Sequence, residues 1–286
     1  MSARAGRLVL VGTPIGNLGD LSARARAALA EADVICCEDT RRTRALLSAV
    51  GVGGGSRLVS VHEHNEVARI PQVLEWLAAG RLVAVVTDAG LPGISDPGER
   101  LVAAAADGGF EVVVVPGPSS VLAALVASGL PTARFCMEGF LPRKGAPRRS
   151  RLAALAAEER TAVILEAPPR LAATLRDLLA VCGDRPVAVA RELTKVHEEV
   201  WRGTLGAAAT RYDEHPVRGE VVLVLGGALP DAPASDEDIE AAVRSRLAEG
   251  AGPREVAASV AAALGVSKRV AYTLAIELRG GDEARP

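Results

Sequence analysis

Aromatic residues are scarce in this sequence, with three Phe, two Tyr and two Trp among 286 residues. So few rings leave little with which the chain could read a base sequence directly. Lysine is nearly absent as well, since Lys144, Lys195 and Lys268 are the only three and arginine supplies almost all the positive charge. No segment approaches the roughly 18 apolar residues of a membrane span, and the apolar run before Gly12 is too short for a signal peptide. We therefore expect a cytoplasmic protein with no membrane segment.

The four cysteines form neither a CxxC pair nor a metal-ligand spacing. Their apolar neighbours indicate reduced, buried thiols, and we expect no metal site. The formal net charge of −2 argues against a generally basic protein that coats nucleic acid, but it says nothing about local patches.

Short β-branched runs alternate with Ala/Leu-rich segments through most of the chain, which is typical of an α/β protein with largely parallel strands. Five predicted strands lie in the first half, from "RLVLVG" to "EVVVVPG", and five more follow "PGPSS", from "RFCMEGF" to "EVVLVLGG". We predict two α/β domains, residues 1–118 and 119–228, with a linker after them.

The last segment, residues 235–286, has a purely helical pattern. Ser235 with Asp238 can cap its first helix, Gly250 and Gly265 end the first two helices, and Pro253 and Ser267 begin the next two. Two short helices joined by a glycine turn, with "SKR" opening the second, resemble a helix-turn-helix. This small domain is either a nucleic-acid contact or a plain three-helix cap.

Three glycine-rich or proline-rich loops end three strands of the first predicted sheet: "GTPIGNLGD", "DAGLPGISDPG" and "PGPSS". The spacing fits neither a dinucleotide fingerprint nor a triphosphate-binding loop. Ligands of open α/β sheets bind outside the carboxyl ends of the strands, so the loops can wall one crevice. A crevice of backbone and hydroxyl groups, poor in cations, suits an adenosine-bearing ligand without phosphates. S-adenosylmethionine fits best, because Asp88 would favour its cationic sulfonium.

With these motifs the chain resembles the ribosomal RNA small-subunit methyltransferase I family of the tetrapyrrole-methylase-like (class III) methyltransferases. The resemblance rests on "GTPIGNLGDLS", "EDTRRT", "HEHNE", "DAGLPGISDPG", "PGPSS", "GFLPRKG", "EAPPR", "RELTKVHEEV" and "RGEVVLVLGG", in that order. It implies two α/β domains with the S-adenosylmethionine cleft between them, a helix-turn-helix-like tail, and assembly as a homodimer. The implied reaction is 2'-O-methylation of a cytidine ribose in the decoding region of 16S ribosomal RNA, within the small subunit.

The resemblance also implies cofactor contacts at particular positions. From the first domain and the start of the second these are Ile15, Asp88, Leu91, Ser119 and Ser120, and from the rest of the second they are Leu165, Ala190 and Gly219.

The general base stays open, with Lys144, Lys195 and Glu192 as the leading candidates and His62 and His64 behind them. Lys144 is alternatively an exposed phosphate contact. Alternation would place both histidines on one face of a strand.

Basic residues without any acidic neighbour run from Gly139 to Ala157, and they predict an electropositive patch beside the cleft. The expected RNA contacts are Arg41, Arg42, Arg143, Lys144, Arg148 and Arg149, with Phe140 stacking on an extruded base or else packing in the core. Two alternatives remain: a methylase of precorrin-type tetrapyrroles, and a nucleic-acid-binding regulator that acts through its C-terminal helices.

Overall fold

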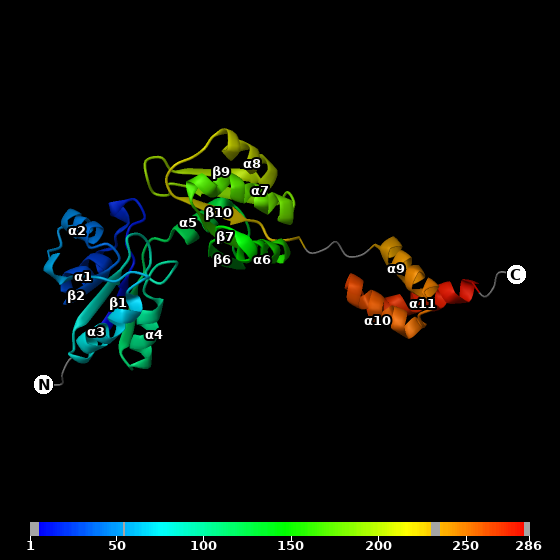
Figure 1. Cartoon of the computed structure of the whole chain (residues 1–286), viewed down its shortest axis with the longest axis horizontal. Helices are drawn as coiled ribbons and strands as arrows, with labels where there is room; N and C mark the ends of the chain where they lie inside the picture. Colours follow the sequence, from blue (N-terminus) through cyan, green and yellow to red (C-terminus); the bar gives the residue numbers. More distant parts are fainter. Residues whose placement is uncertain (1–5, 54, 230–234, 283–286) are drawn as a thin grey trace. The chain divides into compact units, whose positions relative to one another are not determined.

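The computed structural model describes residues 6–53, 55–229 and 235–282. The chain forms two compact units, Met1–Gly227 and Ala228–Pro286, and each is described by itself. Unit 1 contains two five-stranded sheets with their helices, and unit 2 contains three helices (Figure 1). We call the part of unit 1 up to residue 118 the first lobe and residues 119–227 the second lobe.

The first lobe is built on a wholly parallel sheet of strand order β3-β2-β4-β1-β5. Its strands are β1 Arg7–Val11, β2 Val34–Cys37, β3 Leu58–Ser60, β4 Leu82–Val86 and β5 Glu111–Val115; its helices are α1 Ala23–Glu31, α2 Thr40–Ala49, α3 Glu66–Ala78 and α4 Glu99–Asp107, with 3-10 turns at Leu18–Asp20 and Gly55–Arg57. The prediction of parallel strands is confirmed here.

Helices cover both faces of this sheet, which explains why its central strands are apolar at every position except Arg7 of β1. One core joins Val9 and Val11 of β1 to α1 and α2, and a second core joins Leu8 and Leu10 to α3 and α4. All five residues of β4 are buried. Parallel strands with helices on both faces bring the carboxyl ends of the strands, and the loops that follow them, to one edge.

A buried carboxylate fixes the beginning of α4. Glu66 is 5% exposed, and its Oε1 accepts hydrogen bonds from the backbone N–H groups of Gly98, Arg100 and Leu101 at 3.0 to 3.1 Å. These are N–H groups that a helix leaves without partners at its first turn. The second Glu of the "HEHNE" motif therefore has a structural task.

The second lobe carries a mixed sheet of strand order β6-β7-β10-β8-β9, in which only β6 and β7 run parallel. Its strands are β6 Phe135–Phe140, β7 Thr161–Glu166, β8 Pro186–Arg191, β9 Glu199–Thr204 and β10 Val221–Leu225; its helices are α5 Ser120–Ser128, α6 Gly145–Ala157, α7 Leu171–Cys182 and α8 Leu205–Glu214, with a 3-10 turn at Pro168–Arg170. The expectation of largely parallel strands is wrong for this lobe, because apolar runs do not encode strand direction.

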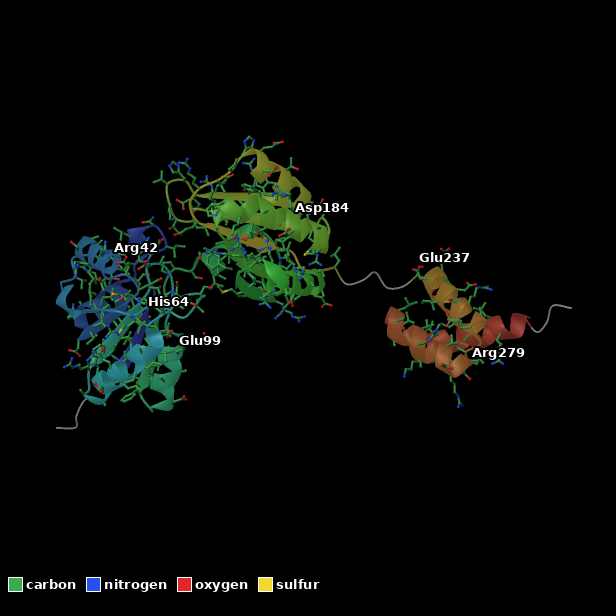
Figure 2. The ribbon with its side chains drawn as sticks, in the orientation of Figure 1. Arg42, His64, Glu99, Asp184, Glu237 and Arg279 are labelled. Atoms are coloured by element: carbon green, nitrogen blue, oxygen red, sulfur yellow. The ribbon has the colours of Figure 1, made fainter. Side chains whose placement is uncertain are left out.

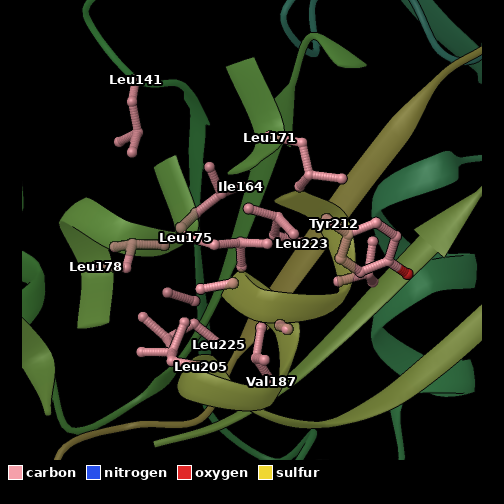
Figure 3. Close-up of a cluster of buried hydrophobic side chains, with 14 of the residues drawn as sticks. Leu141, Ile164, Leu171, Leu175, Leu178, Val187, Leu205, Tyr212, Leu223 and Leu225 are labelled. Carbon is pink, nitrogen blue, oxygen red and sulfur yellow. The ribbon is translucent and has the colours of Figure 1, made fainter. Parts of the chain in front are cut away.

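The main core of the second lobe lies between the sheet and α6, α7 and α8 (Figure 3). The opposite face of the sheet packs on α5 through Val121, Ala124 and Leu125. Ile15, from the loop after β1, joins that second core. A first-lobe side chain is thus part of the packing of the second lobe.

Unit 2 consists of α9 Asp236–Ala248, α10 Pro253–Leu264 and α11 Lys268–Asp282, around a small core of Ile, Val and Ala side chains. The predicted capping box of Ser235 and Asp238 is present, Pro253 opens α10, and Gly265 ends it in the left-handed conformation. In the described part of the chain, no helix is long and apolar enough to cross a membrane.

Candidate functional site

The first two glycine-rich loops are held together by backbone hydrogen bonds. The N–H of Thr13 donates to the carbonyl of Gly90 at 2.8 Å, and the N–H of Gly90 donates back to Thr13 at 3.2 Å. The buried Thr13 hydroxyl also donates to the carbonyl of Thr87 at 3.2 Å. The loops after β1 and β4 therefore form one continuous backbone wall.

The third loop approaches the first through two glycines. A Cβ on Gly12 would lie 2.7 Å from the Cα of Gly117, and a Cβ on Gly117 would lie 2.8 Å from the Cα of Gly12. Real Cβ atoms do not approach backbone that closely, so both positions need glycine. The three predicted loops therefore do converge at one edge of the first sheet.

The loops after β4 and β5, together with the second lobe, enclose a cavity of about 350 Å³, which we call the main cavity. It falls within the usual size range of ligand pockets. Its first-lobe wall includes Gly90, Leu91 and Asp96. Its other walls include Ser119, Ser120, Phe140, Leu165, Glu166, Gly219 and Glu220. Five of the eight predicted cofactor residues line it: Leu91, Ser119, Ser120, Leu165 and Gly219.

A second cavity of about 430 Å³ adjoins the main cavity and shares Ala89 and Glu220 with it. Ile15 and Asp88 line this side cavity, together with Arg42 and Lys195. Ala190, the remaining predicted cofactor residue, lines neither cavity. It is 1% exposed in the middle of the second sheet, where it pairs with Val222 of the cavity wall. Ala190 therefore supports the wall from behind.

Asp88 already has partners. Its carboxylate accepts a hydrogen bond from Nη1 of Arg42 at 2.8 Å and from the N–H of Asp39 at 3.2 Å. Arg42 projects from α2, and its side chain is largely exposed (Figure 2). Part of the Asp88 charge is thus compensated before any cationic ligand binds, and the charge of Arg42 is partly compensated as well.

Two candidate bases, Glu192 and Lys195, form a clamp with Glu220. Lys195 Nζ lies 2.8 Å from Glu192 Oε1 and 3.2 Å from Glu220 Oε2, and Glu192 Oε1 also accepts from the N–H of Glu220 at 2.8 Å. Burial lowers the pKa of Lys195. The hydrogen bonds to the two carboxylates raise this pKa by more than burial lowers it, so it ends above the usual value. The hydrogen bond from Lys195 lowers the pKa of Glu192. Neither group is adapted to take up a proton near neutral pH.

The clamp also carries backbone strain. Glu192 and Thr194 have positive φ angles of 50° and 68°, which are unusual for residues with side chains. A Cβ on Gly219 would lie 2.3 Å from the Glu192 side chain, and one on Gly16 would lie 2.4 Å from Cγ of Lys195. Side chains of the segment after β8 therefore pack closely against Gly16 of the first lobe and Gly219 of the second. Gly219 lines the main cavity, and Gly16 lines the side cavity.

The basic segment at the start of α6 divides into exposed and buried residues. Arg143, Lys144 and Arg149 are exposed, and among the described residues none of the three has an ion-pair partner. Lys144, one of the candidate bases, lines neither cavity. Arg151 pairs with Glu138.

Arg148 does not fit the prediction that it contacts RNA. It is 9% exposed, and its guanidinium donates to Asp177 at 2.7 and 2.9 Å, to the carbonyl of Pro142 and to the hydroxyl of Thr174. All of these partners belong to the protein. Arg148 is a structural residue of the second lobe.

A buried network that the motifs did not reveal continues from Arg148 to the cavity wall. The Thr174 hydroxyl, which accepts from Arg148, donates to Glu166 Oε2 at 2.6 Å, and Arg170 pairs with Glu166 Oε1 at 3.2 Å. Arg170 in turn donates to the carbonyl of Leu141. In the sequence, the only sign of this network was the spacing of Glu and Arg in "EAPPR", four residues apart. They tie the end of β7 to the loop after β6.

The histidine pair does not lie on a strand, contrary to expectation. His62 and His64 follow β3 in a turn that precedes α3, and their rings meet edge to face at 6.0 Å. Neither histidine lines one of the two cavities.

Two other placements bear on the site. Phe140, which ends β6, is 60% exposed and lines the main cavity, so it is not a core residue. Asp96, which was not a candidate, lines the main cavity directly after Ser95, whose φ of 60° is strained. An acid that follows a glycine loop, as in "SDPG", was the only signal for it.

Comparisons with known proteins agree with this geometry. Residues 7–209 match the model of the Tetrapyrrole (Corrin/Porphyrin) Methylases. The chain is 45% identical over 276 residues to the ribosomal RNA small subunit methyltransferase I of Synechocystis sp., covering 96% of this chain and 98% of that one. It is 48% identical to the protein of the same name from Mycobacterium tuberculosis, covering 98% and 99%.

A relative of that name from Thermotoga maritima is 46% identical over 222 residues, 78% of this chain and 99% of its own. Its whole length is thus about that of unit 1. Among solved structures, a uroporphyrin-III C-methyltransferase from Thermus thermophilus complexed with S-adenyl homocysteine is 26% identical. It has a TM-score of 0.55 and covers 77% of this chain and 97% of that one.

Proposed function

The chain belongs to the ribosomal RNA small subunit methyltransferase I family of the tetrapyrrole methylases, and we propose that it methylates the ribose 2'-oxygen of a cytidine in the decoding region of 16S ribosomal RNA. It is an S-adenosylmethionine-dependent methyltransferase. The observation that carries the proposal is the pair of adjoining cavities, which the three glycine-rich loops and the second lobe enclose together.

The residues present fit this cofactor. Most residues that line the main cavity are apolar, and no basic side chain lines it, which suits an adenosine-bearing ligand without phosphates. Glu220 and, in the side cavity, Asp88 bring negative charge toward a cationic donor. When bound, S-adenosylmethionine supplies an electrophilic methyl group.

The protein's task is then to hold the ribose hydroxyl in line with that methyl group and to keep water out. Correct positioning of two reactants can contribute roughly 7–11 kcal/mol to lowering a barrier. Leu91, Ser119, Ser120, Leu165 and Gly219 are the residues we propose to orient the cofactor in the main cavity, with Ile15 and Asp88 beside them. Ala190 would act only by supporting the wall.

On the RNA side, the exposed cations Arg143, Lys144 and Arg149 are proposed to contact phosphates, since they follow Phe140 of the main cavity directly in the chain. Arg41 and Arg42 on α2 are proposed to extend this surface. Phe140 is exposed enough to stack on the extruded cytosine. A substrate in the small ribosomal subunit also implies a cytoplasmic location.

We also propose that the protein is a homodimer. Large apolar side chains are exposed on three consecutive elements, Val114 on β5, Leu122 and Val126 on α5, and Phe135 on β6. Val126 is 73% exposed, which is unusual for an apolar residue in the middle of a helix. A second copy of the chain would remove these side chains from water.

The deciding experiment supplies purified protein and labelled S-adenosylmethionine to small ribosomal subunits that lack the methyl mark, and in parallel to a precorrin. We expect label on a single ribose 2'-oxygen of the RNA and none on the tetrapyrrole. Label on the precorrin alone would favour the tetrapyrrole methylase alternative. Steep salt-dependent DNA binding without any methyl transfer would favour a regulator that acts through α9 to α11.

A further inference from the structure

Asp96 lies on the wall between two hollows of different character. On one side is the main cavity, where its neighbours on the wall are Ser95 and Ile94. On the other side is a hollow of about 320 Å³, which Asp96 shares with Glu38, Glu63, Glu66, Glu99 and one cation, Arg100. Asp96 therefore lines the main cavity on one side and lies among other acidic residues on the other.

The loop that carries Asp96 is fixed by its backbone and by the second lobe. The N–H of Gly93 donates to the carbonyl of Pro97 at 3.1 Å, which closes the loop around Asp96. A Cβ on Gly139, next to Phe140, would lie 3.5 Å from the Ser95 hydroxyl, so β6 lies against this loop. The positive φ of Ser95 is held in place by these contacts, and such strain is concentrated at functional sites.

The other ionisable groups of the two cavities are already engaged. Glu166 is buried between Thr174 and Arg170, Glu220 and Lys195 belong to the clamp, and Asp88 is paired with Arg42. Asp96 is the one acid of the main cavity that has no ion-pair partner among the described residues. It also lies on the same cavity as Phe140, where the target nucleotide is proposed to bind.

The electrostatics of this position match the task of accepting a proton. Burial raises the pKa of Asp96 to about 6, and the negative charges of Glu38 and Asp88 contribute to the increase. A base is most effective when its pKa is close to the working pH. Asp96 is therefore still ionised at neutral pH, yet a better proton acceptor than an ordinary aspartate.

We propose that Asp96 is the general base of the methyl transfer, an inference that rests on the proposed function. As the ribose 2'-oxygen forms its bond to the methyl carbon, its proton passes to the Asp96 carboxylate. The bond between that carbon and the sulfonium breaks, and its electron pair stays on the sulfur as a neutral thioether. The products are the 2'-O-methyl ribose, S-adenosylhomocysteine and a protonated Asp96, which returns its proton to water.

The test is Asp96→Asn in the full-length protein, assayed in single turnover with saturating S-adenosylmethionine and unmethylated small subunits. We expect the rate to fall by at least about 100-fold, because general-base help contributes typically 10²- to 10⁴-fold. Cofactor affinity should change by less than about threefold. Glu99→Gln is the matched control, since it removes one charge from the acidic hollow without touching the main cavity, and its rate should be unchanged.

The pH profile separates a catalytic role from a structural one. The wild-type rate should rise with pH and level off above about 6, where Asp96 is deprotonated, and Asp96→Asn should lack this rise. Glu38→Gln removes a neighbouring negative charge and should move the midpoint of the rise to lower pH. If Asp96 had only a structural role, neither Asp96→Asn nor Glu38→Gln would change the pH dependence of the rate.

Thermal unfolding tests whether a loss of rate in Asp96→Asn comes from a loss of stability. A carboxyl whose pKa is raised by folding destabilises the folded state above that pKa, so Asp96→Asn should melt no lower than wild type at pH 8. A variant that is stable but keeps its rate, or one that loses rate only because it melts early, would overturn the inference. If the wild-type protein itself transfers no methyl group to the subunits, the proposed function fails instead.

Discussion

The two lobes of unit 1 build their shared cavities in different ways. The first lobe contributes glycine-rich loops to the main cavity, because its parallel strands all end at one edge. The second lobe contributes side chains held by ion pairs, such as Glu166 with Arg170 and Glu192 with Lys195. There the cavity wall forms where the end of β7 meets the start of the antiparallel β10, with Glu166 opposite Val221.

This difference teaches that the two lobes tolerate different changes. A backbone wall is sensitive to added volume, whereas a side-chain network is sensitive to the loss of a partner.

The largest effect is expected for Gly117→Val in the first lobe. Its Cβ would lie 2.8 Å from the backbone of Gly12, and neither strand end can move without disturbing the sheet. We expect the free energy of unfolding to fall by at least about 2 kcal/mol and cofactor binding to be lost. Urea denaturation and calorimetry measure the two effects. Gly53→Val, where nothing lies within 4 Å of the new Cβ, is the control; equal losses in both variants would contradict the close-approach argument.

A smaller effect is expected for Arg148→Ala in the second lobe, compared with its neighbour Arg149→Ala. Loss of the buried guanidinium leaves Thr174 and the carbonyl of Pro142 without their donor, and should lower the free energy of unfolding by about 2 kcal/mol. Arg149→Ala should change it by less than about 0.5 kcal/mol.

RNA binding should show the reverse order. Arg149→Ala should weaken binding and reduce the salt dependence by about one counterion, as expected for one phosphate contact. A folded Arg148→Ala should bind RNA normally, and equal RNA losses would return Arg148 to the interface.

An effect on stability smaller than that of Arg148→Ala is expected where the lobes meet, for Gly219→Ala. The positive φ of 92° costs about 1 kcal/mol for alanine, and the new methyl group displaces the Glu192 side chain from the clamp. We expect the Kd for S-adenosylmethionine to rise about tenfold. Gly183→Ala has a similar φ of 72° and an open surrounding, so it should carry the same strain without the loss of affinity. Similar Kd values for the two variants would show that the clamp does not shape the cavity.

Much of the architecture was predictable because it follows from local pattern. The β-branched runs, the glycine loops and the caps of α9 and α10 all appear where the sequence places them. The convergence of three loops was also predictable, since parallel strands with helices on both faces leave their carboxyl ends at one edge. Strand direction in the second sheet was not, because a buried apolar strand reads the same in either direction.

The sequence by itself determined which loops could form a pocket for a ligand without phosphates. These loops carry glycines, which the close approach of one backbone to another requires. Only the tertiary structure decided which charges are free to act. Arg148 and Arg149 are adjacent and chemically identical, yet one is buried against Asp177 and the other is exposed. Asp88 and Asp96 belong to one loop, yet one is paired with Arg42 and the other faces the main cavity without a counter-ion in the described chain. The reason is physical: the charge state and reach of a side chain depend on partners and burial contributed by distant segments, which no local pattern records.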